Sequence, residues 1–217
     1  MAQDALVLFA TGSSIAVEYA ATCRRLGLAI AAGVANREGP SYLPAGIALA
    51  KAEGIAPELL AYPCLCPLFT PANRTVAVRE ARALGFEFPR HLVDPTAIVA
   101  DDFEIGGGSF VNAGVVVGAA ASFGAHVVVN RSASIGHHVR LDDFVSIGPG
   151  AILAGHVRVG AGAMIGAGAI VLPGCRIGEG AVVGAGSIVT RDVDSGGRVM
   201  GTAARSVRSA GGRAVAR

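Results

Sequence analysis

The chain has 217 residues and a formal net charge of +2, with 52% hydrophobic and 5% aromatic residues. This length allows a sizeable buried core, and the hydrophobic fraction excludes a disordered chain. The small net charge gives no indication of a nucleic-acid partner, and no apolar run reaches the length of a membrane span. The chain begins without the pattern of a secretory signal and its four cysteines lack metal spacing, so we expect a cytoplasmic protein with reduced thiols.

The first 90 residues predict a Rossmann-like α/β domain. Residues 5–9 are a short apolar run typical of a buried strand, and residues 15–26 have the pattern of an amphipathic helix. Residues 28–34 predict a second strand, which completes the strand, turn, helix and strand of a βαβ unit. The remaining elements expected here are a weak strand and helix within 40–60, a strand within 64–69 and a helix over 72–84.

The turn after the first strand is Thr11-Gly12-Ser13-Ser14, in which a serine offers an N-cap for the helix. A dinucleotide fingerprint needs several glycines so that backbone N–H groups can approach a phosphate, and only one is present. The sequence therefore leaves open whether this domain binds a nucleotide, another small molecule or nothing.

From residue 93 to residue 189, every sixth position is Val, Ile, Leu or Phe without interruption. These positions are Val93, Val99, Ile105, Val111, Val117, Phe123, Val129, Ile135, Leu141, Ile147, Leu153, Val159, Ile165, Val171, Ile177, Val183 and Val189. Neither a helix nor a simple strand has this period, which is typical of a β-helix. A glycine often follows the aliphatic residue, and we expect it to supply a positive φ at a tight corner. Three such hexads predict one coil of roughly eighteen residues, so residue i lies under residue i+18.

This register places His137 on the outside of the coil, with Ala119 and Gly155 as its stack neighbours. Between a methyl group and a hydrogen, the imidazole lies in a notch with room for a ligand. Imidazole is the usual group for taking a proton from a hydroxyl or an amine near neutral pH, although an ordinary interface histidine is the alternative. His138 stacks on His156, a pair that could share a proton or bind a metal. No third suitably placed histidine is evident, so we expect no metal site.

Two further columns follow from the same register. Asn112 and Asn130 are eighteen residues apart and predict a side-chain amide ladder. A column of arginines repeats at the same interval and comprises Arg140, Arg158 and Arg176. Like charges in a row repel, so the column needs either acidic residues of a neighbouring subunit or the phosphates of a coenzyme.

The hexads and the stretch from Asn130 to His138, NRSASIGHH, resemble the sialic acid O-acetyltransferase and UDP-amino-sugar N-acetyltransferase group of hexapeptide-repeat enzymes. The resemblance implies a Rossmann-like substrate domain at 1–90, a left-handed parallel β-helix at 91–205 and a basic tail at 206–217. It also implies a homotrimer that uses acetyl-CoA as co-substrate. His137 matches the family's catalytic base, and His138 stands where the family usually has an acidic residue that orients the base.

The resemblance also implies which residues bind the two substrates. The coenzyme contacts fall at Ser146, Gly155, Ala167, Ala185 and Arg205, the last of which closes the motif that begins at Gly201. The acceptor contacts fall at Gly12, Ser13, Ser14, Asn36 and Asn130.

The implied function is direct transfer of an acetyl group to a hydroxyl or amine of a sugar or sugar nucleotide, in the synthesis of surface glycans. No order of side chains suggests a covalent intermediate, and a backbone N–H, such as that of Gly155, would stabilise the oxyanion. The alternative is a non-catalytic β-helix scaffold or a metabolite-binding protein with a degenerate site.

Overall fold

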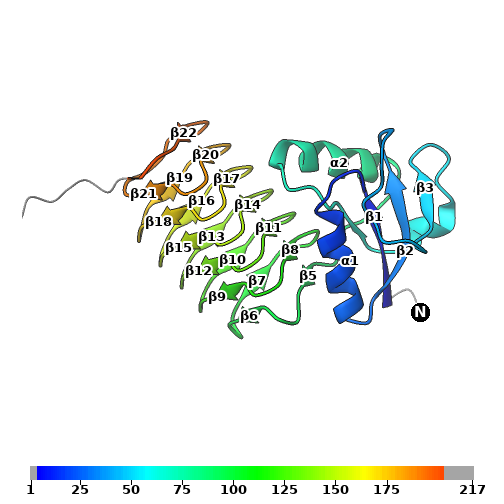
Figure 1. Cartoon of the computed structure of the whole chain (residues 1–217), viewed down its shortest axis with the longest axis horizontal. Helices are drawn as coiled ribbons and strands as arrows, with labels where there is room; N and C mark the ends of the chain where they lie inside the picture. Colours follow the sequence, from blue (N-terminus) through cyan, green and yellow to red (C-terminus); the bar gives the residue numbers. More distant parts are fainter. Residues whose placement is uncertain (1–3, 203–217) are drawn as a thin grey trace, which may run out of the picture.

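The computed structural model describes residues 4–202 and contains two parts, a small α/β domain and a long parallel β-helix (Figure 1). The N-terminal domain has a four-stranded parallel sheet in the order β3-β2-β1-β4. Its central strand, β1 (Ala5–Phe9), is buried along its whole length, as its apolar sequence predicts. The other elements are α1 (Ala16–Arg25), β2 (Ala29–Ala35), β3 (Leu49–Lys51), the 3-10 helix η2 (Pro57–Ala61), β4 (Cys64–Leu65) and α2 (Pro71–Ala83). The predicted Rossmann-like domain is therefore confirmed, with most boundaries within a residue or two.

One local expectation is wrong. Helix α1 starts after Ile15, and no side chain among the residues that the structure describes caps its N-terminus. Ser13 contributes its backbone instead, because its carbonyl oxygen accepts a hydrogen bond from the Ala16 N–H at 2.9 Å. Among residues 4–202, no helix is both long and apolar enough to cross a membrane. All four cysteines are free and buried.

The β-helix consists of two-residue strands that form three parallel sheets, one for each face of the coil. The face that packs on the N-terminal domain, called the docked face, contains β5 (Leu92–Val93), β8 (Phe110–Val111), β11 (Val128–Val129), β14 (Ser146–Ile147), β17 (Met164–Ile165), β20 (Val182–Val183) and β22 (Arg198–Val199). The second, called the apolar face, contains β6 (Ile98–Val99), β9 (Val116–Val117), β12 (Ser134–Ile135), β15 (Ile152–Leu153), β18 (Ile170–Val171) and β21 (Ile188–Val189). The third, called the charged face, contains β7 (Glu104–Ile105), β10 (Ser122–Phe123), β13 (Arg140–Leu141), β16 (Arg158–Val159) and β19 (Arg176–Ile177).

The predicted register of the coil is confirmed, because paired strands are eighteen residues apart from Leu92 to Val189. The second residue of each strand points inward, and every such residue from Val111 to Val189 is buried. The first coil is more open, and Val99 is 36% exposed there. A left-handed parallel β-helix with one continuous aliphatic core is therefore the second part of the fold.

The glycines that follow the inward residues have a different role from the one expected. Positive φ angles occur two residues later, for example at Gly150, His138 (φ 59°) and His156 (φ 62°). The earlier glycine is needed because successive coils approach closely at the corner. A Cβ atom on Gly136 would lie 2.7 Å from the backbone nitrogen of Gly155, which no side chain tolerates.

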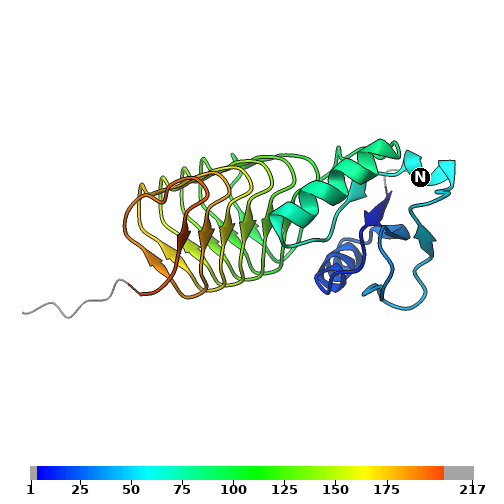
Figure 2. The ribbon, with the colours of Figure 1, turned by 90° about the horizontal axis from the view of Figure 1, so that it is seen from above.

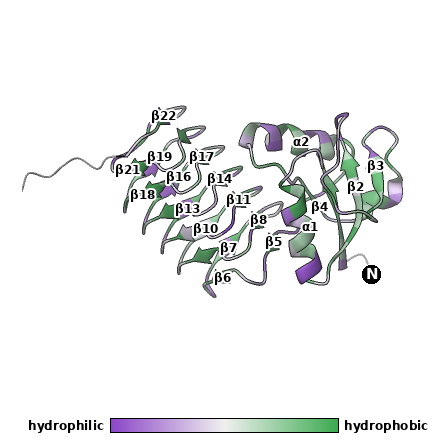
Figure 3. Cartoon of the chain, in the orientation of Figure 1, coloured by the Kyte–Doolittle hydropathy of each residue, from purple (hydrophilic) through white to green (hydrophobic). Residues whose placement is uncertain are grey.

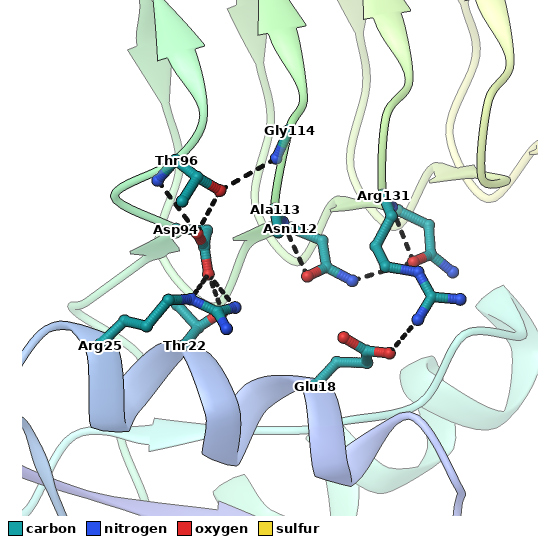
Figure 4. Close-up of polar contacts among 10 residues, drawn as sticks. Glu18, Thr22, Arg25, Asp94, Thr96, Asn112, Ala113, Gly114 and Arg131 are labelled. Carbon is teal, nitrogen blue, oxygen red and sulfur yellow. Dashed lines mark hydrogen bonds and ion pairs between the residues drawn. The ribbon is translucent and has the colours of Figure 1, made fainter.

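The N-terminal domain packs on the docked face through an apolar layer and through polar contacts at both of its edges. Tyr19 of α1 lies against Phe110, with ring centroids 3.9 Å apart. Asp94 receives hydrogen bonds from Thr22 at 2.5 Å and from Arg25 Nε at 2.8 Å, so α1 is held to the first coil (Figure 4). Helix α2 lies along the other edge of the same face (Figure 2).

Arg74 of α2 is fully buried and anchors that edge, and no acidic residue of the described range 4–202 pairs with it. Its guanidinium donates to the backbone carbonyls of His126 (2.8 Å) and Phe144 (2.7 Å) and to the Ser146 hydroxyl (2.9 Å). Burial lowers the pKa of Arg74 to about 10. Since each unpaired buried carbonyl costs free energy, this side chain stabilises the relative position of the two domains.

Candidate active site

The corner between the apolar and charged faces carries His137, and we call it the His corner (residues 136–139 and 154–157). As predicted, the His137 ring lies over Gly155, the residue one coil further on. A Cβ atom on Gly155 would come within 2.6 Å of both Cε1 and Nε2 of His137. The missing side chain at Gly155 is therefore what gives the imidazole its place, and the ring remains exposed.

Three histidines meet at this corner, which the sequence did not predict. His137 Nδ1 lies 3.1 Å from His138 Nδ1. The ring of His156 stacks on that of His138, with centroids 4.7 Å apart, and is nearly perpendicular to His137 at 5.0 Å. One nitrogen from each ring lies within 4.8 Å of the others. The third histidine beside the pair of His138 and His156 is His137 itself, which the eighteen-residue register does not bring to that pair.

The residues expected to contact the coenzyme lie in different places. Gly155 is at the His corner, whereas Ala167 and Ala185 are exposed at the corner between the docked and apolar faces. In the described part of the chain, the backbone N–H groups of these three residues have no hydrogen-bond partner. These N–H groups are free to donate to a carbonyl of a bound molecule. Within one chain, however, the His corner and the corner with Ala167 and Ala185 lie apart.

A further expected coenzyme contact, Ser146, lies on the docked face, away from both of these corners. Ser146 is fully buried at the domain interface, where its hydroxyl accepts from Arg74 and donates to the Phe69 carbonyl at 2.5 Å. Both of its hydrogen-bonding functions are thus used within the chain, which the β-helix pattern alone could not show. Arg205 lies outside the described residues.

The residues expected to bind the acceptor divide into two groups. Gly12 and Asn36 line a cavity of about 350 Å³ where the chain leaves β1 and β2. Ser13 and Ser14 lie beside it at the start of α1 without lining it. Asn130 lies on the β-helix, at the corner between the docked and apolar faces.

A carboxylate that the sequence did not point to joins the cavity residues. Asn36 donates to Glu80 of α2 at 2.7 Å, and Arg37 donates to the same carboxylate at 2.5 Å. These hydrogen bonds lower the pKa of Glu80. A carboxylate is therefore supplied next to Asn36, from a helix 44 residues further along the chain.

The predicted amide ladder is present, since Asn112 Nδ2 donates to Asn130 Oδ1 at 3.0 Å. The same oxygen accepts from the Arg131 backbone N–H at 2.8 Å, and the Arg131 side chain forms an ion pair with Glu18 of α1 (Figure 4). The ladder thus forms part of the edge at which α1 is held to the coil.

The two faces that the N-terminal domain leaves uncovered differ in character. The outward residues of the apolar face include Ile98, Val116 and Ile152, which are 68%, 44% and 44% exposed. The charged face presents the predicted arginine column, whose exposed members are paired in register. Figure 3 shows hydrophobic colouring along β18 and β21 of the apolar face and hydrophilic segments at β16 and β19.

Comparison with known proteins finds this architecture in other hexapeptide-repeat proteins. Residues 156–191 match the model described as bacterial transferase hexapeptide (six repeats), and no curated protein matches the chain. A histidine-to-asparagine mutant of perosamine N-acetyltransferase from Caulobacter crescentus, in complex with CoA and GDP-perosamine, is 27% identical with a TM-score of 0.80, over 90% of this chain and 93% of that one. The acetyltransferase domain of PglB from Neisseria gonorrhoeae, in complex with acetyl coenzyme A, is 29% identical with a TM-score of 0.80, over 91% and 96%. The chain is therefore similar to hexapeptide-repeat acetyltransferases in sequence and in fold.

The likeness of this chain to both structures extends over its N-terminal domain as well as its β-helix, because nine-tenths of the chain is covered. WeeI from Acinetobacter baumannii AYE, at 20% identity and a TM-score of 0.73, covers 91% of this chain and 97% of its own and shows the fold alone.

Proposed function

We propose that the enzyme transfers the acetyl group of acetyl-CoA to an amine or hydroxyl of a sugar or sugar nucleotide, with His137 as general base. The observation that carries this proposal is the His137 ring, which lies exposed over Gly155 with its second nitrogen 3.1 Å from His138. The CoA and GDP-perosamine bound to one similar enzyme and the acetyl coenzyme A bound to another support these classes of donor and acceptor. We place the reaction in the cytoplasm, as a step in the assembly of surface glycans.

His138 orients the base in this proposal. If Nδ1–H of His137 donates to Nδ1 of His138, the Nε2 lone pair of His137 is left to accept a proton. A carboxylate would hold the same tautomer more strongly, because a charged acceptor makes the stronger hydrogen bond. His138 therefore performs the orienting part of that role without adding charge.

The reaction needs no covalent intermediate with the enzyme. The acceptor nitrogen or oxygen attacks the thioester carbonyl while His137 Nε2 takes its proton. The Gly155 N–H, which has no hydrogen-bond partner within residues 4–202, donates to the oxyanion that forms. The C–S bond then breaks, and the thiolate of CoA takes the proton back from the imidazolium.

The coenzyme and the acceptor use different parts of the molecule. The backbone N–H groups of Gly155, Ala167 and Ala185 bind carbonyl groups of the coenzyme, whereas Ser146 supports the domain interface. The acceptor binds in the cavity that Gly12 and Asn36 line, with Glu80 nearby to accept hydrogen bonds from hydroxyls.

The enzyme works as a homotrimer, because one chain keeps these parts separate. The N-terminal domain covers the docked face, whereas His137 lies at the corner opposite that face. In a closed three-fold ring of heterologous contacts, the apolar faces turn toward the axis and are buried. The His corner of one copy then meets the corner of the next that carries Ala167, Ala185 and Asn130, beside its acceptor domain. Light scattering should give about 65 kDa, three times the 21.7 kDa of the chain, and a monomer at micromolar concentration would contradict the proposal.

Replacement of His137 tests the assigned base. His137→Ala should leave the fold intact, because the side chain is exposed, and should lower acetyl transfer by roughly 10²–10⁴. Acetyl-CoA binding, measured by calorimetry, should change little, and His138→Ala should lower the rate less. Near-wild-type turnover of His137→Ala, with His138→Ala inactive, would show that the base is the other histidine. Absence of any acyl-CoA binding would favour a non-catalytic scaffold.

A further inference from the structure

The chain has five histidines, and three of them converge at the His corner. His137 and His138 are consecutive, and His156 occupies the position of His138 one coil further on. We propose that His137, His138 and His156 together bind a divalent transition-metal ion such as Zn²⁺.

The distances fit a site of this kind. With Zn–N bonds of about 2.0–2.1 Å, two ligand nitrogens lie roughly 3.4 Å apart in a tetrahedral site and about 2.9 Å apart at a right angle. The 3.1 Å between Nδ1 of His137 and Nδ1 of His138 falls between these values. His156 is the third ligand. Its ligand nitrogen lies within 4.8 Å of those of the other two rings, so the ring must turn toward them, and its exposure allows this.

The backbone fixes the positions of His137, His138 and His156 relative to one another. The His156 N–H donates to the His137 carbonyl at 2.9 Å, so the spacing between the two coils is set by the β-helix itself. His138 and His156 share the left-handed backbone conformation, with φ angles of 59° and 62°, and their side chains therefore leave the coil in the same direction. Only side-chain rotation is needed to close the site.

The ligand set determines the class of metal. Three imidazoles suit Zn²⁺, Cu²⁺ and Ni²⁺, whereas Mg²⁺ and Ca²⁺ prefer oxygen ligands. No carboxylate belongs to the cluster among the described residues, so the bound ion keeps its double charge and completes its coordination with water or an anion. Arg140 and Arg158 lie two residues after the two stacked histidines, and their charge weakens binding relative to an acidic site.

Metal binding has a consequence for catalysis that rests on the proposed function. When a metal binds Nδ1 of His137, the neutral imidazole changes tautomer and carries its one ring proton on Nε2 instead of Nδ1. The metal also replaces the hydrogen bond between His137 and His138 that keeps Nε2 free. A His137 that coordinates the metal through Nδ1 and carries its proton on Nε2 cannot accept a proton from the acceptor, so the metal inhibits transfer.

The test is titration of the full-length protein, freed of metal by a chelator, with ZnCl₂ in a calorimeter without acetyl-CoA or acceptor. We expect one Zn²⁺ per chain and no binding of Mg²⁺. His156→Ala removes one of three ligands and should weaken Zn²⁺ binding by at least about tenfold, the lower limit seen for loss of a mere supporting group around a metal. His91→Ala is the matched control, since it removes an exposed histidine outside the cluster, and should bind Zn²⁺ like the wild type.

The proposal is overturned if wild-type protein shows no saturable Zn²⁺ binding, or if His156→Ala binds as tightly as the wild type while its melting curve shows a folded protein. A separate activity measurement tests the inhibition, which Zn²⁺ should cause in wild type at concentrations that spare His156→Ala. Binding is measured without turnover, so a failure of the metal proposal and a failure of the acetyltransferase proposal are distinguishable.

Discussion

Gly155→Ala tests whether the notch under His137 controls catalysis. The new Cβ atom would lie 2.6 Å from Cε1 and Nε2 of His137, against an ordinary contact distance of about 3.5 Å. The ring must therefore move by about 1 Å, and a displacement of that size costs on the order of 100-fold in rate. Gly155 does not have a positive φ, so alanine introduces no backbone strain of its own. We expect kcat to fall by about 100-fold, or about 2.7 kcal/mol, while the protein remains folded.

The assay follows release of the CoA thiol with a sugar-nucleotide amine as acceptor, alongside thermal unfolding by circular dichroism. A double variant supplies the control, because Gly155→Ala should change the rate less than about twofold once His137 is already alanine. The reasoning is refuted if Gly155→Ala has wild-type kcat. It is also refuted if the two substitutions multiply their effects, since Gly155 would then act independently of the ring.

Three further predictions concern stability. Arg74→Met leaves several buried carbonyls unpaired and should destabilise the protein by at least about 3 kcal/mol, seen as a lower denaturant midpoint; an unchanged midpoint would contradict the anchoring role. Burial lowers the pKa of His126 from 6.5 to about 4, so only the unfolded chain binds a proton there between these values, and stability should fall by up to about 3 kcal/mol as the pH drops from 6.5 to 4. Asparagine tolerates the same positive φ, so His126→Asn should reduce this loss of stability, measured as a smaller drop in melting temperature over the same pH range. Below pH 3.8, protonation of Asp94, whose pKa is lowered to about 2, should destabilise the protein further. Tyr19→Phe removes a buried hydroxyl that has no partner among the described residues and should leave the melting temperature equal or higher; a loss above 1 kcal/mol would reveal a hydrogen bond.

The β-helix could be predicted from the sequence because its core places one inward residue in every six. That strict period fixes the register, and the register alone places His137 over Gly155. The register predicts the position of each residue on the coil but not the direction of its side chain. It therefore does not predict that the ring of His137 meets those of His138 and His156. The role of the corner glycines was also misjudged, since the close approach of the next coil is a property of stacking rather than of local φ.

The contacts between the two domains could not be predicted in this way. Arg74 and Ser146 are 72 residues apart and meet only because α2 lies along the docked face. Glu80 and Asn36 meet across a separation of 44 residues. Neither pair follows a period, so the sequence pattern does not show that Ser146 bonds to Arg74 or that Glu80 bonds to Asn36.

The most direct test of the central claim is the activity of mixed trimers, because the account places each active site between two copies. One variant, His137→Ala, lacks the base, and the other, Gly12→Tyr, fills the acceptor cavity; each alone should be nearly inactive. In randomly mixed trimers, an intact His137 faces an intact cavity on the next copy at about a quarter of the sites. The account predicts recovery of about a quarter of wild-type turnover after co-expression or subunit exchange. Mixed trimers that stay as inactive as the two variants would contradict it, since base and acceptor domain would then have to come from the same chain.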